Sequence, residues 1–108
     1  MEDALTPSQL EVAAKVLKAM AHPVRLGVMQ LLSDGEQTVT QLYEALGCSQ
    51  SMMSQQLAQL ESHGLISTHK EGTAKYCSLR NRDFMKVFAC MRNHLLGVLH
   101  LPPDDAAG

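Results

Sequence analysis

Aromatic residues are scarce in this chain of 108 residues, which has no tryptophan, two tyrosines and two phenylalanines. Aliphatic side chains and seven methionines must therefore fill the interior, and hydrophobic residues make up 45% of the chain. A chain of this length and composition is expected to form one domain. The hydrophobic content is enough for a core, but that core is small for a protein that remains a monomer.

Long apolar runs are also missing. No stretch approaches the roughly 18 residues that a membrane span needs. The N-terminal sequence MEDALTPSQL is acidic and polar, unlike a secretory signal. These two absences predict a cytoplasmic protein.

The three cysteines, Cys48, Cys77 and Cys90, cannot all pair within one chain and match no zinc-finger spacing. Free thiols in a reducing compartment are the simpler interpretation.

The chain has no overall excess of positive charge, since its net charge is −2. Its charges are nevertheless unevenly distributed. Residues 1–46 contain three Lys or Arg and six Asp or Glu, whereas residues 47–92 contain six Lys or Arg and three acids. Because local field matters more than the total for phosphate contact, the second half is compatible with nucleic-acid binding. Modest basicity per chain favours two copies acting together.

The stretch from Thr38 to Leu65 predicts a short helix, a tight turn and a second helix. Gly47 ends the first helix, Ser49 can cap the second, and Gly64 closes it. The inward positions of the second helix recur at helical spacing: Met53, Leu57 and Leu60. Its outward face carries short amide and hydroxyl side chains: Gln50, Ser51, Ser54, Gln55, Gln59 and Ser62. A solvated surface is the commoner role of such a face, but these side chains also hydrogen-bond base edges in a major groove.

Periodicity predicts the remaining elements. Helices are expected over residues 6–20 and 23–33, and a β-hairpin over residues 65–79. The hairpin tip carries Lys70 and Lys75, so it can act as a wing that reaches a DNA backbone. A last helix is expected over residues 81–100. Its apolar stripe is too long for one small core, which predicts pairing with a second subunit, aided by the first helix. The methionines at core-like positions are expected to fill gaps: Met20, Met29, Met53 and Met91.

With this element order, the phrases LKAMAHPVRLGVMQLL, LGCSQSMMSQQLAQLESHGLI and KEGTAKYCSL closely resemble the ArsR/SmtB family of winged helix–turn–helix repressors. The resemblance implies a mainly α fold with a small β-hairpin: five helices plus a two-stranded wing. The expected domain covers residues 8–100, between a flexible N-terminus (1–7) and a tail (101–108). The family implies a homodimer that binds an inverted-repeat DNA operator, with one recognition helix per half-site. A ligand or thiol event then releases or tightens the DNA.

Together, capping and the resemblance assign the DNA-binding positions. The candidates are Thr38, Ser49, Gln50, Ser51, Ser54, Gln55, Gln56, Lys70 and Lys75.

The family's metal sites are degraded in this sequence. Thr38 and Thr40 stand where the thiolate site has its cysteines, and hydroxyls do not replace thiolates on a soft metal. The other family site falls on Asn81, Asp83, His94 and Gly97, of which only Asp83 and His94 could still ligate. No cofactor is therefore expected.

Cysteine chemistry remains as a candidate sensor. Cys90 lies one helical turn before His94, and the two could form a reactive thiol or share a soft metal, which leaves a metal-responsive repressor as an alternative. Cys48 precedes the cap of the recognition helix, where a helix dipole favours a thiolate. For both cysteines an unreactive structural role is commoner. Cys77 is expected to face the core, with a Cys77–Cys90 or intersubunit pair left open.

Two other function classes compete with DNA binding. A protein-interaction module could keep the fold and use the apolar last helix for a partner, but it would not need the polar recognition face. An enzyme would need a nucleophile with an oriented base. Cys90 and His94 are the only candidate pair of nucleophile and base, and no third catalytic group supports them. We therefore expect a transcriptional regulator and no enzyme.

Overall fold

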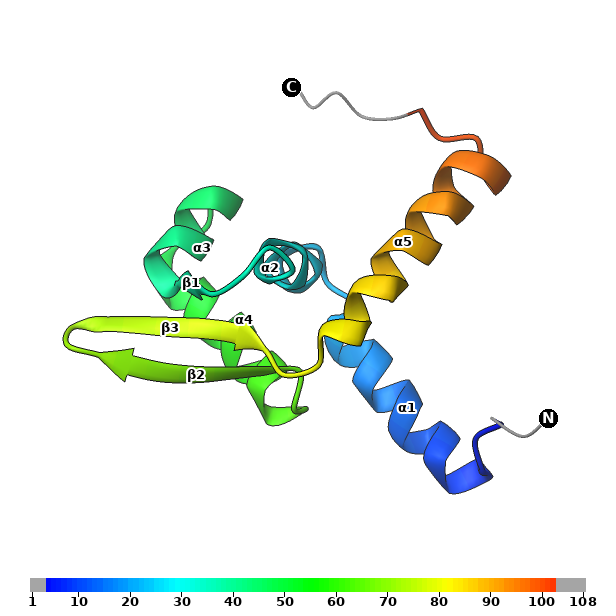
Figure 1. The fold of residues 1–108 in the computed structure, drawn as a ribbon, viewed down its shortest axis with the longest axis horizontal. Helices are drawn as coiled ribbons and strands as arrows, with labels where there is room; N and C mark the ends of the chain where they lie inside the picture. The colour runs from blue at the N-terminus through cyan, green and yellow to red at the C-terminus, as the bar shows by residue number, and fades with distance from the viewer. Residues whose placement is uncertain (1–3, 103–108) are drawn as a thin grey trace.

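The computed structural model of the protein describes residues 4–102 (Figure 1). Helices and strands follow one another in this order: α1 (Pro7–Met20), α2 (Pro23–Leu32), β1 (Gln37–Thr38), α3 (Val39–Leu46), α4 (Gln50–Ser62), β2 (Ile66–Glu71), β3 (Ala74–Leu79) and α5 (Met85–Asn93). A 3-10 turn at Arg82–Phe84 precedes α5, and a π-helical turn at His94–Val98 continues it. Parts of the expected flexible N-terminus and tail, residues 1–3 and 103–108, lie outside the described residues.

Side-chain caps explain why the helices begin where the sequence predicted. Thr6 accepts a hydrogen bond from the backbone N–H of Gln9, whose side chain bonds back to the N–H of Thr6. Thr38 and Gln41 form the same reciprocal box at the start of α3. Each box satisfies two backbone N–H groups that a helix start leaves without a partner.

The turn between α3 and α4 depends on Gly47. This residue has φ +67°, a left-handed conformation that glycine adopts without steric cost. The next N–H, of Cys48, donates to the carbonyl oxygen of Tyr43 at 3.1 Å and closes the end of α3. The chain then enters α4 through Ser49, whose hydroxyl accepts from the N–H of Met52 at 3.1 Å. The predicted helix–turn–helix is confirmed.

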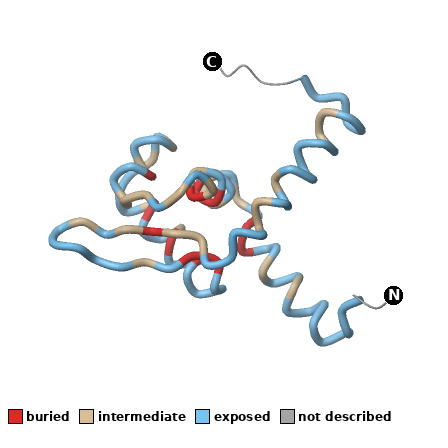
Figure 2. Tube along the Cα trace, viewed as in Figure 1, coloured by how far each residue is buried: buried red, intermediate tan, exposed pale blue. Residues whose placement is uncertain are grey.

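The core lies where α2, α3, α4 and the base of the hairpin meet (Figure 2). Its buried members include the residues predicted to face inward on α4, namely Met53, Leu57 and Leu60. Cys77 is also buried, as its position on the second strand predicted. The core of the single chain is small, as expected from the composition.

The predicted two-stranded wing is confirmed as the hairpin of β2 and β3, and a third short strand that the sequence did not indicate joins its sheet. The sheet is antiparallel with strand order β1–β3–β2, because β1 pairs Gln37 with Cys77 and Thr38 with Tyr76. Two residues are too few to produce an alternating pattern in the sequence. The additional strand ties the start of α3 to the wing.

The C-terminal helical region, expected as one helix over residues 81–100, consists of three successive segments. It projects with α1 from the side of the molecule opposite the wing tip (Figure 1), and Figure 2 shows that both are mostly exposed. Met91 is 51% exposed, so its predicted place in the core is wrong for the single chain, because α5 extends past that core. Among residues 4–102, none of the helices combines the length and the hydrophobicity of a membrane span.

Candidate nucleic-acid interface

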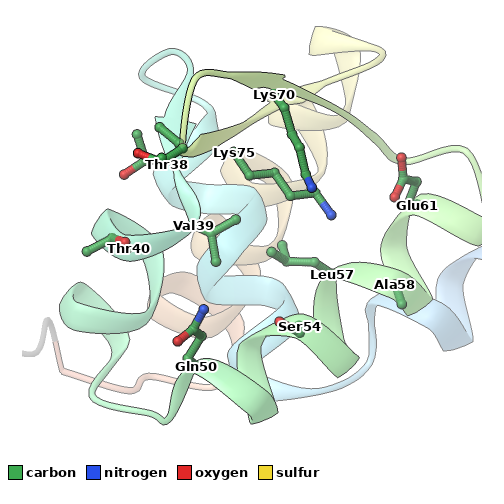
Figure 3. Close-up of a pocket in the computed structure, with 12 residues that line it drawn as sticks. Thr38, Val39, Thr40, Gln50, Ser54, Leu57, Ala58, Glu61, Lys70 and Lys75 are labelled. Atoms are coloured by element: carbon green, nitrogen blue, oxygen red, sulfur yellow. The ribbon is translucent and has the colours of Figure 1, made fainter.

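A groove of about 360 Å³ runs between α4, the start of α3 and the wing (Figure 3). Three separate parts of the fold line it: Thr38, Val39 and Thr40 from β1 and α3; Gln50, Ser54, Leu57, Ala58 and Glu61 from α4; and Lys70, Thr73, Ala74 and Lys75 from the wing. The groove therefore brings together five of the residues that the sequence predicted for DNA binding: Thr38, Gln50, Ser54, Lys70 and Lys75.

Two lysines form the wing side of this groove. Lys70 and Lys75 are directly opposite each other across the β2–β3 pair, and both are exposed. Like charges in this position repel each other in the absence of a bound anion. Figure 3 shows both side chains reaching from the wing over the groove, toward the side that carries Gln50 and Ser54. The pair supplies concentrated positive charge beside the amide and hydroxyl side chains of α4.

The predicted outward face of α4 is exposed along its whole length, at Gln50, Ser51, Ser54, Gln55, Gln59 and Ser62. These residues do not all face the groove. Gln50 and Ser54 line it, whereas Gln55 lines a hollow on the other flank of α4. Ser51 lies in the first turn, with its hydroxyl 3.3 Å from that of Ser49. The exposed ridge of α4 is thus polar on both flanks.

Gln56 differs from its neighbours on α4. It is half-buried, and its Oε1 accepts a hydrogen bond of 2.7 Å from Nη1 of Arg25 on α2. Its amide oxygen is therefore already engaged within the protein. The structure gives Gln56 a contact between helices, and its predicted role at DNA remains a prediction.

Thr38 and Ser49 serve as helix caps at the edge of the interface. Each hydroxyl oxygen accepts from a backbone N–H, of Gln41 and Met52 respectively. The hydroxyl protons are not used by these bonds and can still donate to an acceptor such as a phosphate oxygen. Capping and phosphate contact are therefore compatible at both positions.

Sequence reasoning missed an acidic residue of the groove, Glu61. Its Oε2 accepts a 2.9 Å hydrogen bond from Thr68 Oγ1 on β2, which joins the end of α4 to the wing. Its place could have been found from its spacing, because Glu61 follows Gln50 by about three helical turns at 3.6 residues per turn. This carboxylate makes one end of the groove unfavourable for a phosphate.

The three thiols have very different surroundings. Cys77 is buried, and desolvation raises the pKa of its thiol from 9.0 to about 11, with the nearby Lys75 opposing that shift. Cys48 is half-buried and Cys90 is exposed, and all three are free. Cys77 is therefore unsuited to act as a reactive thiolate. The sensor roles predicted for Cys48, Cys90 and His94 remain predictions.

Asp83 and His94, the weak candidates for a metal site, do not belong to a larger group of possible ligands among the described residues. Within residues 4–102, no three His, Cys, Asp or Glu side chains are close enough to hold a metal ion together. The carboxylate of Asp83 instead lies 3.4 Å from Nζ of Lys86. His94 is exposed at the start of the π-helical turn.

Comparison with known proteins agrees with this fold. A family model described as a helix-turn-helix domain matches residues 20–69. The transcriptional regulator Rv0324 of Mycobacterium tuberculosis is 34% identical over 83 residues. That match covers 77% of this chain but 37% of Rv0324, so the chain spans little more than a third of that relative.

Solved structures match over most of their length. HlyU from Vibrio cholerae superposes with a TM-score of 0.74 and 32% identity, covering 86% of this chain and 99% of HlyU. A homodimeric winged helix-turn-helix DNA-binding domain from Mycobacterium bovis, Mb0332, is described as a possible ArsR-family regulator. It gives a TM-score of 0.73 and 30% identity, covering 87% of this chain and 94% of that fragment. The chain belongs to the ArsR/SmtB family of winged helix–turn–helix transcriptional regulators.

Proposed function

We propose that this protein is a homodimeric transcriptional regulator that reads an inverted-repeat operator with the exposed face of α4. In this proposal Gln50, Ser54 and Gln55 contact base edges, and Lys70 and Lys75 contact the phosphate backbone. One observation carries the proposal: exposed amide and hydroxyl side chains of α4 lie beside a pair of exposed lysines.

The chemistry of α4 supports base contact. Short amide and hydroxyl side chains can donate and accept, so they can match the donor and acceptor pattern that each base pair presents in the major groove. The helix has 13 residues, and its buried side holds it firmly on the core through Met53, Leu57 and Leu60. A rigid helix with a polar outer ridge suits the major groove, which admits one α-helix.

The wing supports contact with phosphates. Neither Lys70 nor Lys75 is among the ion pairs that residues 4–102 form, so the charge of the pair is not neutralised by a carboxylate there. Thr38 adds a hydroxyl at the same groove. Lysine contacts with phosphates contribute affinity that is independent of sequence and falls with salt.

The exposed apolar residues of α1 and the C-terminal region support a dimer. The side chains concerned are 37–62% exposed and include Leu10, Leu17, Val87, Met91, Val98 and Leu99. Such a surface is costly in a monomer and is typical of a subunit interface. Mb0332, which has the same fold, is homodimeric. A two-fold axis would present two copies of α4 to two half-sites, which explains the expected inverted repeat.

Repression is the mode of action that we infer, because a dimer bound at a promoter can block transcription by occupancy alone. The protein would then act on DNA in the cytoplasm and carry out no catalytic step. Release of the DNA by a thiol-directed or other small inducer is part of the proposal, with Cys48 and Cys90 as the accessible thiols.

Selection from a pool of random duplex DNA tests the proposal. The purified protein should enrich a sequence with two-fold symmetry, and sedimentation should give twice the mass of one chain. A Leu17→Glu, Val98→Glu double variant should sediment as a monomer and lose the enrichment. Binding without any sequence preference, or a monomeric wild-type protein, would contradict the proposal.

A further inference from the structure

A second basic feature lies on the flank of α4 away from the wing. It is a cavity of about 240 Å³ between α1, α2 and the end of α4, lined by Lys15, Lys18, Ala19, Arg25, Gln59 and His63. A neighbouring hollow shares Arg25 and Gln59 with it and continues along α4 to Gln55. No pattern in the sequence indicates this cavity, because its charged and titratable groups come from three separate helical segments.

The cavity is positively charged and has no acidic residue in its lining. Three of its six lining residues are Lys or Arg, and none is Asp or Glu. The ion pairs formed within the described part of the chain involve His69 and Lys86 but none of the cavity's residues. Arg25 donates to the neutral amide of Gln56, and its Nε is buried without a partner among residues 4–102. An anion would relieve the mutual repulsion of these cations.

His63 lines the same cavity at the C-terminal end of α4. Its Nδ1 lies 2.9 Å from the backbone oxygen of Gln59 and 3.2 Å from the hydroxyl oxygen of Ser62. These contacts hold the imidazole ring in place at the edge of the cavity.

The positions along α4 relate the two basic features to each other. Gln50 and Ser54 line the groove beside the wing, whereas Gln55 and Gln59 line the opposite flank. Ala58 lies between them and borders both hollows. A helix inserted in the major groove has one phosphate backbone on each side. The wing lysines can reach one backbone, and the cavity lies on the side of the other.

We propose that this cavity binds a phosphate group of the DNA backbone on the flank of α4 opposite the wing. Lys15 and Lys18 would supply the charge, and Arg25 would do so from its fixed position against Gln56. The inference rests on the proposed insertion of α4 into the major groove. A free phosphate ion offers the same chemistry, so the test must separate the two sources.

The test compares Lys15→Ala, Lys18→Ala with the wild-type dimer by fluorescence anisotropy at several salt concentrations. The DNA is the selected operator and an unrelated duplex of equal length. We expect weaker binding to both, with the preference for the operator unchanged. Removal of one phosphate interaction from each subunit should flatten the plot of log affinity against log salt by about 0.9 per interaction, or roughly 1.8 per dimer. Lys86→Ala, on the exposed side of α5, is the matched control and should leave the slope unchanged.

Two further measurements identify the cause of a negative result. Inorganic phosphate is titrated into the DNA-free protein while backbone amide shifts are followed by NMR. Saturable binding at Lys15 and Lys18 with an unchanged DNA salt slope would overturn the inference in favour of a free-anion site. An unchanged slope without phosphate binding would also overturn it. Lys70→Ala, Lys75→Ala is run alongside: a flatter slope only in this variant preserves the proposed function, whereas unchanged slopes in both variants contradict it.

Discussion

Nη1 of Arg25 on α2 donates a 2.7 Å hydrogen bond to Oε1 of Gln56 on α4. The two residues are 31 positions apart in the sequence, and their contact joins α4 to α2. The Nε of Arg25 is buried and donates to no acceptor among residues 4–102. The contact adds a polar link to the buried packing that holds the helix that we propose to read DNA.

Gln56→Ala should therefore destabilise the fold. Hydrogen bonds to charged groups contribute about 1.5–3 kcal/mol, and partial exposure of this pair favours a decrease of about 1–2 kcal/mol in the free energy of unfolding. Urea unfolding of the dimer at fixed protein concentration measures it. Gln55→Ala is the control, because an exposed substitution usually changes stability by less than about 0.5 kcal/mol. Equal effects of the two substitutions would contradict a structural role for Gln56.

Gly47→Ala should also destabilise the protein, through the backbone of the turn. The φ of +67° at this position costs a residue with a Cβ roughly 1–2 kcal/mol, although nothing lies within 4 Å of the added carbon. Gly47→Asn should cost less, because asparagine tolerates the left-handed conformation better. The midpoint temperature of thermal unfolding should therefore be highest for the wild type, lower for Gly47→Asn and lowest for Gly47→Ala. A lower midpoint for Gly47→Asn than for Gly47→Ala would contradict this interpretation of the turn.

Lys70→Ala combined with Lys75→Ala should weaken binding to every duplex tested. Without these phosphate contacts, affinity falls regardless of sequence and depends less steeply on salt. Anisotropy titrations between about 50 and 200 mM salt measure both the affinity and its dependence on salt. Because both side chains are exposed on the wing, the unfolding transition should remain close to that of the wild type. An unaltered salt slope would remove the wing from the DNA contact.

Cys77 should resist alkylation in the folded protein. Its thiol is buried with a pKa of about 11, and only the thiolate reacts, so at pH 8 iodoacetamide should label the exposed Cys90 first. The raised pKa also stabilises the fold below about pH 9. That contribution, roughly 3 kcal/mol for a shift of two units, should disappear as the pH rises from about 9 to 11. Rapid labelling of Cys77 at pH 8, measured by mass spectrometry, would contradict its burial.

A thiol sensor is best tested with substitutions that leave the buried Cys77 unchanged. Cys48→Ser with Cys90→Ser removes the two accessible thiols and keeps Cys77, where a serine would bury a hydroxyl. The double variant should lose any release of DNA by peroxide or a soft metal, measured by gel shift. A response that survives would exclude Cys48 and Cys90 as the sensor.

Much of the fold could be predicted from local chemistry. Thr6, Thr38 and Ser49 begin helices because each satisfies a free N–H, and Gly47 ends one because it tolerates a positive φ. These effects depend on residues within a few positions, so the sequence shows them directly. The outward polar face of α4 follows from helical periodicity in the same way.

Features that depend on distant partners were missed or wrong. Strand β1 has two residues and exists because β3 lies beside it. The contact between Arg25 and Gln56 and the basic cavity join separate helices, and no local pattern encodes them. Met91 follows the apolar period of its helix yet is exposed in the single chain, since periodicity defines a face but not what covers it.

The central claim is that the side chains on the outer ridge of α4 read base edges. The most direct measurement is the affinity of Ser54→Ala, Gln55→Ala for the selected operator and for an unrelated duplex. A good base contact contributes about 1–3 kcal/mol, so operator binding should weaken by a few kcal/mol while binding to unrelated DNA stays the same. Unchanged affinity for the operator, with the fold and the dimer intact, would contradict the claim.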